Sequence, residues 1–92
     1  MKRKLIVSPE LEKVVRLLPP EIKKKIRIAL VEILEDPLTG KALVEELQGL
    51  RSYKLGKIRI VYRAEQDGRI SIIAIGPRRS IYEKLILEIR DK

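Results

Sequence analysis

RSYKLGKIRIVYRAEQDGRISIIAI, residues 51–75, is the part of this 92-residue chain that is most informative about its fold. Apolar and polar residues alternate along most of it, which is typical of β-strands. Two short breaks in the alternation, Gly56-Lys57 and Gln66-Asp67-Gly68, have the composition of hairpin turns. We therefore expect an antiparallel meander with strands over residues 51–55, 58–64 and 69–75.

The turns predict which residues face each other in this meander. A two-residue turn at Gly56-Lys57 places Lys54 opposite Arg59, and a turn at Asp67-Gly68 places Tyr62 opposite Ile73 and Arg63 opposite Ile72. The predicted apolar face contains Tyr53, Leu55, Ile58, Ile60, Tyr62, Ile73 and Ile75, and the predicted second face contains Ser52, Lys54, Arg59, Val61, Arg63, Ile72 and Ala74. Two cations opposite each other repel, so the second face predicts an anionic partner.

The flanking segments have helical spacing. Residues 2–7 are expected to form a strand that ends at Ser8-Pro9, a capping pair for a helix with apolar positions from Leu11 to Leu18. Pro19-Pro20 ends that helix and begins a second one, which runs to Asp36-Pro37, and the two form a helical hairpin. In the tail, residues 80–92, one helical stripe contains Ile81, Leu85 and Ile89. The expected fold is α+β, with an N-terminal strand, a helical hairpin, a three-stranded antiparallel meander and a short C-terminal helix, in one domain over residues 1–92.

Composition limits the chemistry. Without Cys or His, the chain cannot build a zinc finger, a thiol nucleophile or a Ser-His-Asp triad, and no carboxylate motif suggests a metal site or a cofactor. The net charge of +8 predicts a polyanionic partner, with nucleic acid first and an acidic protein second. A charge-rich surface of the thermophile type is the alternative. No apolar run reaches the roughly 18 residues of a membrane span, so we expect a cytoplasmic protein without a membrane partner.

Two segments together resemble the signature of the RelE/ParE toxin superfamily. They are LRSYKLGKIRIVY at residues 50–62 and IAIGPRRSIY at residues 73–82. In that family, a strand with the pattern R-(V/I)-(V/I)-Y precedes a strand that ends in R-x-x-x-Y, and the order of elements is the one expected here. The resemblance implies a toxin of a bacterial or archaeal toxin-antitoxin pair. Most often such a toxin is a metal-independent endoribonuclease that cuts mRNA in the ribosomal A site.

The resemblance also implies a set of site residues. Lys54, Arg59, Arg78 and Tyr82 match the positions of catalytic and phosphate-contacting residues in RelE-type nucleases. Arginine suits the phosphate because a guanidinium binds its oxygens bidentately. Lys54 and Tyr82 are the candidates for proton transfer, and the sequence leaves open which is base and which is acid. Further RNA contacts are expected from Lys57, Arg63, Arg79 and Arg51.

The chain departs from the family pattern at two positions. Pro77 stands where many relatives have a histidine, and Ser52 lies where the more active nucleases have a denser basic cluster. The alternatives are therefore a ParE-like toxin that inhibits DNA gyrase without being an enzyme, and a catalytically inactive RNA-binding relative. Under either toxin hypothesis, we expect an acidic antitoxin partner, and the stripe Ile81, Leu85 and Ile89 either contacts it or packs on the sheet.

Overall fold

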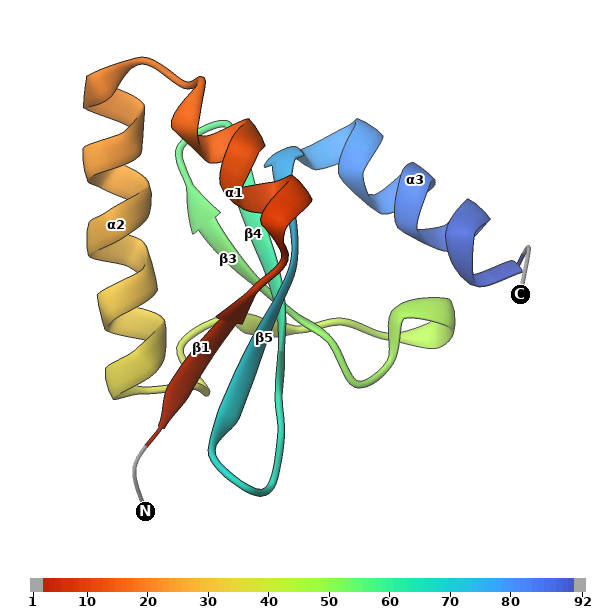
Figure 1. The fold of residues 1–92 in the computed structure, drawn as a ribbon. Coiled ribbons are helices and arrows are strands. Elements are labelled where there is room, and N and C mark those ends of the chain that lie inside the picture. The colour runs from red at the N-terminus through yellow and green to blue at the C-terminus, as the bar shows by residue number, and fades with distance from the viewer. Residues whose placement is uncertain (1–2, 91–92) are drawn as a thin grey trace.

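The computed structural model describes residues 3–90, except for the side chains of residues 78, 79 and 88–90 (Figure 1). The elements, in chain order, are β1 (Lys4–Val7), α1 (Pro9–Arg16), α2 (Pro20–Glu35), β2 (Lys41–Ala42), the 3-10 helix η1 (Glu45–Leu47), β3 (Arg51–Leu55), β4 (Ile58–Ala64), β5 (Arg69–Pro77) and α3 (Arg78–Arg90). This order confirms the expected α+β fold. Two short elements, β2 and η1, were not predicted.

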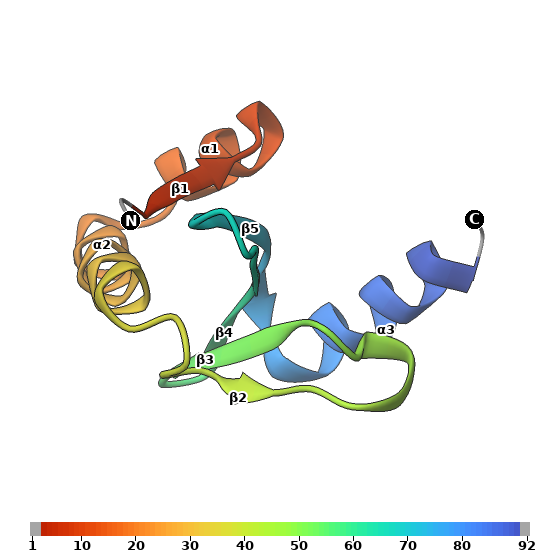
Figure 2. The ribbon, with the colours of Figure 1, turned by 90° about the horizontal axis from the view of Figure 1, so that it is seen from below.

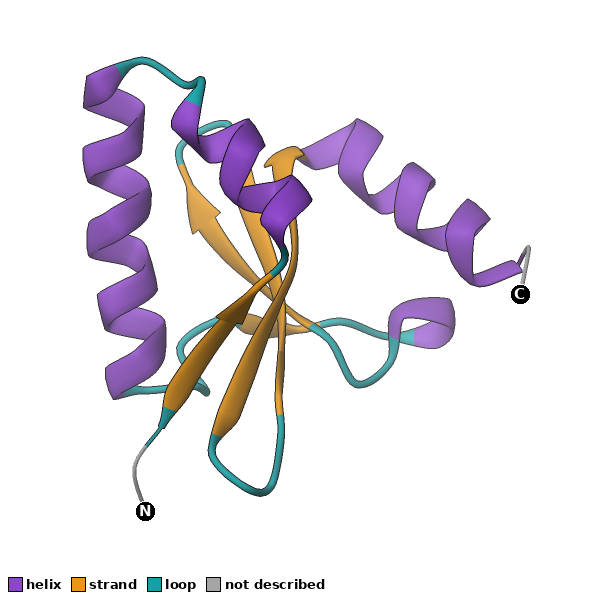
Figure 3. Ribbon diagram, in the orientation of Figure 1, coloured by secondary structure: helices purple, strands orange, loops and turns teal. Residues whose placement is uncertain are grey.

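The strands form one sheet in the order β1-β5-β4-β3-β2. The strands β3, β4 and β5 are the predicted antiparallel meander, while β1 pairs in parallel with β5 at one edge and β2 pairs with β3 at the other (Figure 3). Helices α2 and α3 lie on opposite sides of this curved sheet (Figure 2). Within residues 3–90, no helix has the length and apolar character needed to cross a membrane.

The first two helices begin where the sequence predicts. The Ser8 side chain caps α1 by accepting a hydrogen bond from the Leu11 N–H at 3.2 Å, and Pro9 occupies the first helical position. Helix α2 begins at Pro20 and buries Ile26, Ala29 and Ile33. At its C-terminal end, Arg3 donates to the Glu35 carbonyl at 2.8 Å, which satisfies one of the carbonyls that a helix end leaves unpaired.

Each face of the sheet carries its own apolar cluster. On the α2 side, Ile26, Ala29 and Ile33 pack against the buried strand residues Ile60, Tyr62, Ile70 and Ile72. On the α3 side, Ile81 and Leu85 pack against Val61, Leu47 and Leu50. The prediction that the terminal stripe packs on the sheet is therefore confirmed for Ile81 and Leu85. The Ile89 side chain lies outside the described residues.

The predicted register of the first hairpin is confirmed, and that of the second is wrong at its closed end. Lys54 pairs with Arg59 and Ile60 with Ile75, but Tyr62 pairs with Ile72 and Arg63 with Ser71. The β4–β5 loop is one residue longer than assumed, because Glu65 N–H bonds to the Arg69 carbonyl at 2.8 Å and Gly68 adopts a φ of 92°. A bulge beside Val61 and Tyr62 restores the register. Ile72 is consequently the buried residue, and Ile73 is 36% exposed.

A buried tyrosine holds the segment between α2 and β2. The Tyr62 hydroxyl donates to the Pro37 carbonyl at 2.7 Å and accepts from the Gly40 N–H at 2.9 Å. A Cβ at position 40 would lie 2.6 Å from that hydroxyl, so only glycine fits this close approach without movement. Desolvation raises the pKa of Tyr62, in agreement with its expected place in the core.

Candidate functional site

Lys54 and Arg59 form a cross-strand pair on the α3 side of the sheet. They lie directly opposite each other on β3 and β4. Their neighbours two residues away, Ser52 and Val61, contact α3 residues, so strand alternation places Lys54 and Arg59 on the same side. Opposed residues have Cβ atoms about 5 Å apart. The predicted juxtaposition of the two cations is therefore confirmed.

Among the described side chains, no carboxylate pairs with the two cations. Arg59 donates from one terminal nitrogen to the carbonyls of Gly56 at 2.9 Å and Ile58 at 3.3 Å, which hold the side chain without cancelling its charge. Two close cations without a counter-charge favour an anionic ligand.

Tyr82 reaches the same side of the sheet from α3. Its hydroxyl lies 2.6 Å from the Ser52 Oγ. The flanking helix residue Ile81 and, one turn later, Leu85 are 6% and 5% exposed, so α3 is anchored on the sheet next to this contact. Ser52 and Lys54 are two residues apart on β3, which corresponds to about 7 Å along the strand. The Tyr82 hydroxyl, which lies on Ser52, is therefore about that far along the strand from the level of the Lys54–Arg59 pair.

Arg78 and Arg79 are the first two residues of α3. The backbone leads into them from Gly76 and Pro77, which pair with Arg59 and Ile58 at the end of the sheet. The chain therefore brings the start of α3 to the strand end that carries Arg59. The side chains of Arg78 and Arg79 lie outside the described residues.

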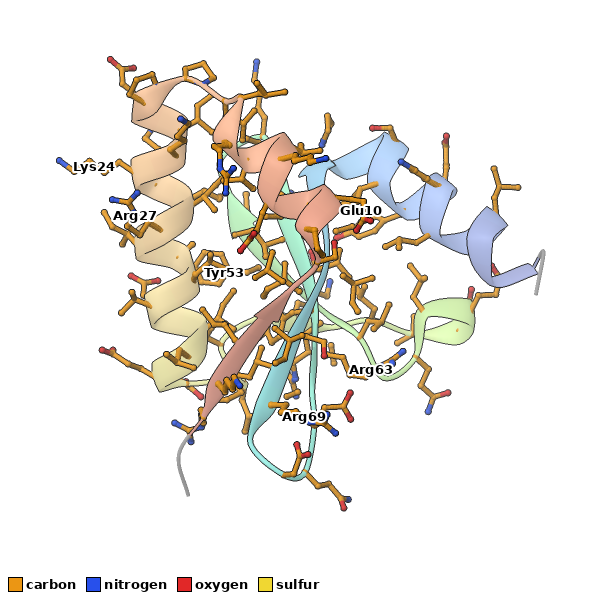
Figure 4. The ribbon with its side chains drawn as sticks, viewed as in Figure 1. Glu10, Lys24, Arg27, Tyr53, Arg63 and Arg69 are labelled. Carbon is orange, nitrogen blue, oxygen red and sulfur yellow. The ribbon has the colours of Figure 1, made fainter. Side chains whose placement is uncertain are left out.

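The other predicted RNA contacts are more dispersed. Lys57 is exposed in the β3–β4 turn, next to the Lys54–Arg59 pair. Arg63 is exposed on the same side but four residues further along β4, about 13 Å from Arg59, towards the β4–β5 loop (Figure 4). Arg51 does not lie with Lys54 and Arg59, because its guanidinium donates to the Gly40 carbonyl at 2.6 Å on the other side of the sheet.

The remaining tyrosines lie on the α2 side. Tyr53 points from β3 towards α2, where its hydroxyl bonds to the Glu32 carboxylate (Figure 4). The pKa of Tyr53 is raised mainly by that hydrogen bond and, to a smaller extent, by burial. Tyr62 is fully buried. Of the three tyrosines, Tyr82 is thus the one on the side of Lys54 and Arg59.

The candidate surface is open, and Lys54, Arg59 and Tyr82 lie outside the groove between α1 and α3. A groove of about 390 Å³ lies between α1 and α3 and is lined mainly by apolar residues, among them Leu11, Val14 and Ile73, without Lys54, Arg59 or Tyr82. An exposed cationic surface suits a charged polymer better than an enclosed small molecule. In the part of the chain that the structure describes, no three Asp or Glu side chains gather into a group that could hold a metal ion.

Ser52 is not among the site residues that the sequence predicts. Its position two residues before Lys54 on the second face was apparent from strand alternation. What the alternation could not show is that α3 crosses the sheet at this point and places the Tyr82 hydroxyl on Ser52.

Comparison with known protein families identifies the family of this chain. The profile of the family described as ParE toxin of type II toxin-antitoxin system, parDE, matches residues 7–82. No curated protein sequence is similar enough to count as a match.

Solved structures with the same fold come from several organisms. The chain is similar to a RelBE toxin-antitoxin complex from Mycobacterium tuberculosis (TM-score 0.72, 25% identity, covering 85% of this chain and 100% of that one). It is also similar to the isolated RelE toxin of E. coli (0.69, 22%, 95% and 98%) and to the YoeB-YefM complex of Staphylococcus aureus (0.68, 20%, 83% and 97%). The profile covers most of the chain, and the chain therefore belongs to the ParE toxin family of type II toxin-antitoxin systems, within the RelE/ParE superfamily.

Proposed function

We propose that this protein is a toxin that cleaves mRNA on the ribosome, without a metal ion or cofactor, and thereby inhibits translation in the cytoplasm. The observation that carries the proposal is the gathering of the Lys54–Arg59 pair and the Tyr82 hydroxyl on one side of the sheet. These are the residue types that a metal-free cleavage of a phosphodiester requires.

The proposed reaction is an internal displacement at phosphorus. The 2′-oxygen of the RNA loses its proton and attacks the adjacent phosphate, the bond from phosphorus to the 5′-oxygen breaks, and that oxygen takes up a proton. The products are a 2′,3′-cyclic phosphate and a 5′-hydroxyl. Arg59 has further N–H donors beyond those bonded to Gly56 and Ile58, and these suit the phosphate oxygens as negative charge develops. Arg78, at the start of α3, is the second proposed phosphate contact.

Lys54 and Tyr82 are the proposed proton-transfer residues. They lie on the same side of the sheet and come from different elements, Lys54 from β3 and Tyr82 from α3. One removes the proton from the 2′-hydroxyl and the other supplies the proton to the leaving 5′-oxygen. Lys57, Arg63 and Arg79 are proposed to hold the flanking RNA. Arg51 is proposed mainly to hold the loop that contains Gly40, to whose carbonyl it donates.

An acidic antitoxin is the second proposed partner. Two of the similar structures described above are toxin-antitoxin complexes. A segment rich in Asp and Glu would neutralise the surface of this chain, whose net charge is +8.

The test is cleavage of a defined mRNA by the purified protein, with and without 70S ribosomes and with a chelator present, followed by mapping of the cut sites and end chemistry. We expect cuts only with ribosomes, unaffected by the chelator, with 2′,3′-cyclic phosphate and 5′-hydroxyl ends. Intact mRNA in every condition would contradict the proposal, and so would a different pair of ends.

A second candidate follows from the ParE family profile. ParE-like toxins inhibit DNA gyrase and are not enzymes, and the fold is shared by both kinds of toxin. The same protein preparation should be added to a gyrase supercoiling assay. Inhibition of supercoiling together with intact mRNA would favour this candidate.

A further inference from the structure

Ser52 is a polar residue in an apolar place. It is the buried polar residue of the described core, with 7% of its surface exposed, and it lies opposite Val61, which is fully buried. Burying a hydroxyl among apolar side chains costs free energy unless the hydroxyl is bonded, so packing alone would favour Ala or Val here. The partner that compensates Ser52 is the Tyr82 hydroxyl at 2.6 Å.

The contact selects one orientation of the Tyr82 ring. Helix α3 is anchored by Ile81 and Leu85, but two staggered wells of the Tyr82 χ1 angle remain open in a helix. The bond to Ser52 favours the well that points the hydroxyl at β3. Lys54 follows two residues later on the same side of that strand, so the bond also fixes how far the phenol lies from the Lys54–Arg59 pair.

The contact suits both roles that Tyr82 could take, because the Ser52 hydroxyl can be the donor in each. To act as the base, Tyr82 must have lost its proton, and the Ser52 hydroxyl then donates to the phenolate oxygen. To act as the acid, Tyr82 keeps its proton for the leaving oxygen, and the Ser52 hydroxyl again donates to the phenol oxygen. A serine hydroxyl rotates freely enough to serve both states.

We infer that Ser52 is a positioning residue for Tyr82, which holds the phenol in place for proton transfer during cleavage and does not itself contact the RNA. The inference rests on the proposed nuclease function. It assigns to Ser52 an effect on the rate of the chemical step, and little effect on the affinity for the ribosome and mRNA.

The test compares two substitutions, Ser52→Thr and Ser52→Val, whose new side chains have nearly the same shape as each other. Both side chains are β-branched and suit a strand, but only threonine keeps a hydroxyl. The measurements are the single-turnover rate of mRNA cleavage and the ribosome concentration that gives half the maximal rate. We expect Ser52→Val to lower the rate about 10- to 100-fold, as a misplaced catalytic group does. The half-saturating concentration should stay unchanged, and Ser52→Thr should keep most of the rate.

A double-mutant cycle separates positioning from a merely structural role. In a Tyr82→Phe background there is no phenol hydroxyl to position, so adding Ser52→Val should cause no further loss. Urea unfolding of each variant checks that its fold is intact. Ser52→Ala serves as a second variant without a hydroxyl if valine is too large for the site.

The possible failures are distinct. If the wild-type protein cleaves mRNA but Ser52→Val and Ser52→Ala keep the full rate, the inference is overturned and the nuclease function stands. It is also overturned if the loss from Ser52→Val is as large in the Tyr82→Phe background as in the wild type. If the wild-type protein does not cleave ribosome-bound mRNA, the proposed function fails and the inference falls with it.

Discussion

Replacing Tyr62 by Phe tests the structural account of the segment between α2 and β2. The substitution keeps the ring, which is fully buried, and removes the hydroxyl that bonds to Pro37 and Gly40. In the variant, the buried Gly40 N–H has lost its acceptor and the half-buried Pro37 carbonyl has lost its donor. An unsatisfied buried backbone group costs about 1–3 kcal/mol.

The expected loss in the free energy of unfolding is about 2 kcal/mol, because Gly40 is buried and bears most of the cost, while Pro37 can recover a bond from water. For a chain of this size, 1 kcal/mol corresponds to a shift of roughly 4–8 °C in melting temperature. We therefore expect the melting temperature to fall by about 8–16 °C.

The same substitution at Tyr53 is the matched control. Its hydroxyl is also bonded, but to the Glu32 carboxylate at a position that water reaches. Water can replace that bond, so Tyr53→Phe should cost less than about 1 kcal/mol. Both variants are compared with the wild type by urea and thermal unfolding, followed by circular dichroism. An equal or larger loss at Tyr53 would show that the bonds of the Tyr62 hydroxyl do not stabilise this segment as described.

Three further predictions concern pH, a helix end and RNA binding. Burial raises the folded-state pKa of Tyr62 above the unfolded value near 10, so its contribution to stability is complete below about pH 10 and is lost as pH rises through the folded pKa. Urea unfolding should show a steeper alkaline loss for the wild type than for Tyr62→Phe. Arg3→Ala removes the exposed donor to the Glu35 carbonyl and should lower the free energy of unfolding by about 0.5 kcal/mol, and an unchanged urea midpoint would contradict this. Arg59→Gln should reduce the salt dependence of single-stranded RNA binding, with the log–log slope falling by about 0.7, as measured by fluorescence anisotropy. An unchanged slope would mean that Arg59 contacts no phosphate.

The sequence predicts the first hairpin well because its turn is local. Two residues, Gly56 and Lys57, fix the pairing of every residue in β3 and β4. The second hairpin is less predictable, since a three-residue loop closed by Gly68 has nearly the same composition as a two-residue one, and the bulge that compensates for it leaves no pattern. This is why Ile72 and Ile73 exchanged faces.

Tertiary contacts decide what the sequence could not show. Segment 41–50 has no regular period, and Leu47 and Leu50 are buried because α3 lies over them. In the site, strand alternation predicts that Lys54 and Arg59 share a face. The contact between Ser52 and Tyr82 joins residues 30 positions apart and depends on the path of α3.

Two double variants show whether the α3 side of the sheet cleaves RNA. Lys54→Ala with Arg59→Ala removes one lysine and one arginine from the candidate surface. Lys24→Ala with Arg27→Ala removes the same charges from the exposed side of α2, where both residues point away from the sheet (Figure 4).

The measurement is the rate of ribosome-dependent mRNA cleavage by the wild type and both double variants, each first shown to be folded. We expect a loss of at least about 100-fold for the Lys54 and Arg59 variant, because it removes one proposed proton-transfer residue and one proposed phosphate contact. The α2 variant should cleave at nearly the wild-type rate. Equal rates for the two variants would contradict the account.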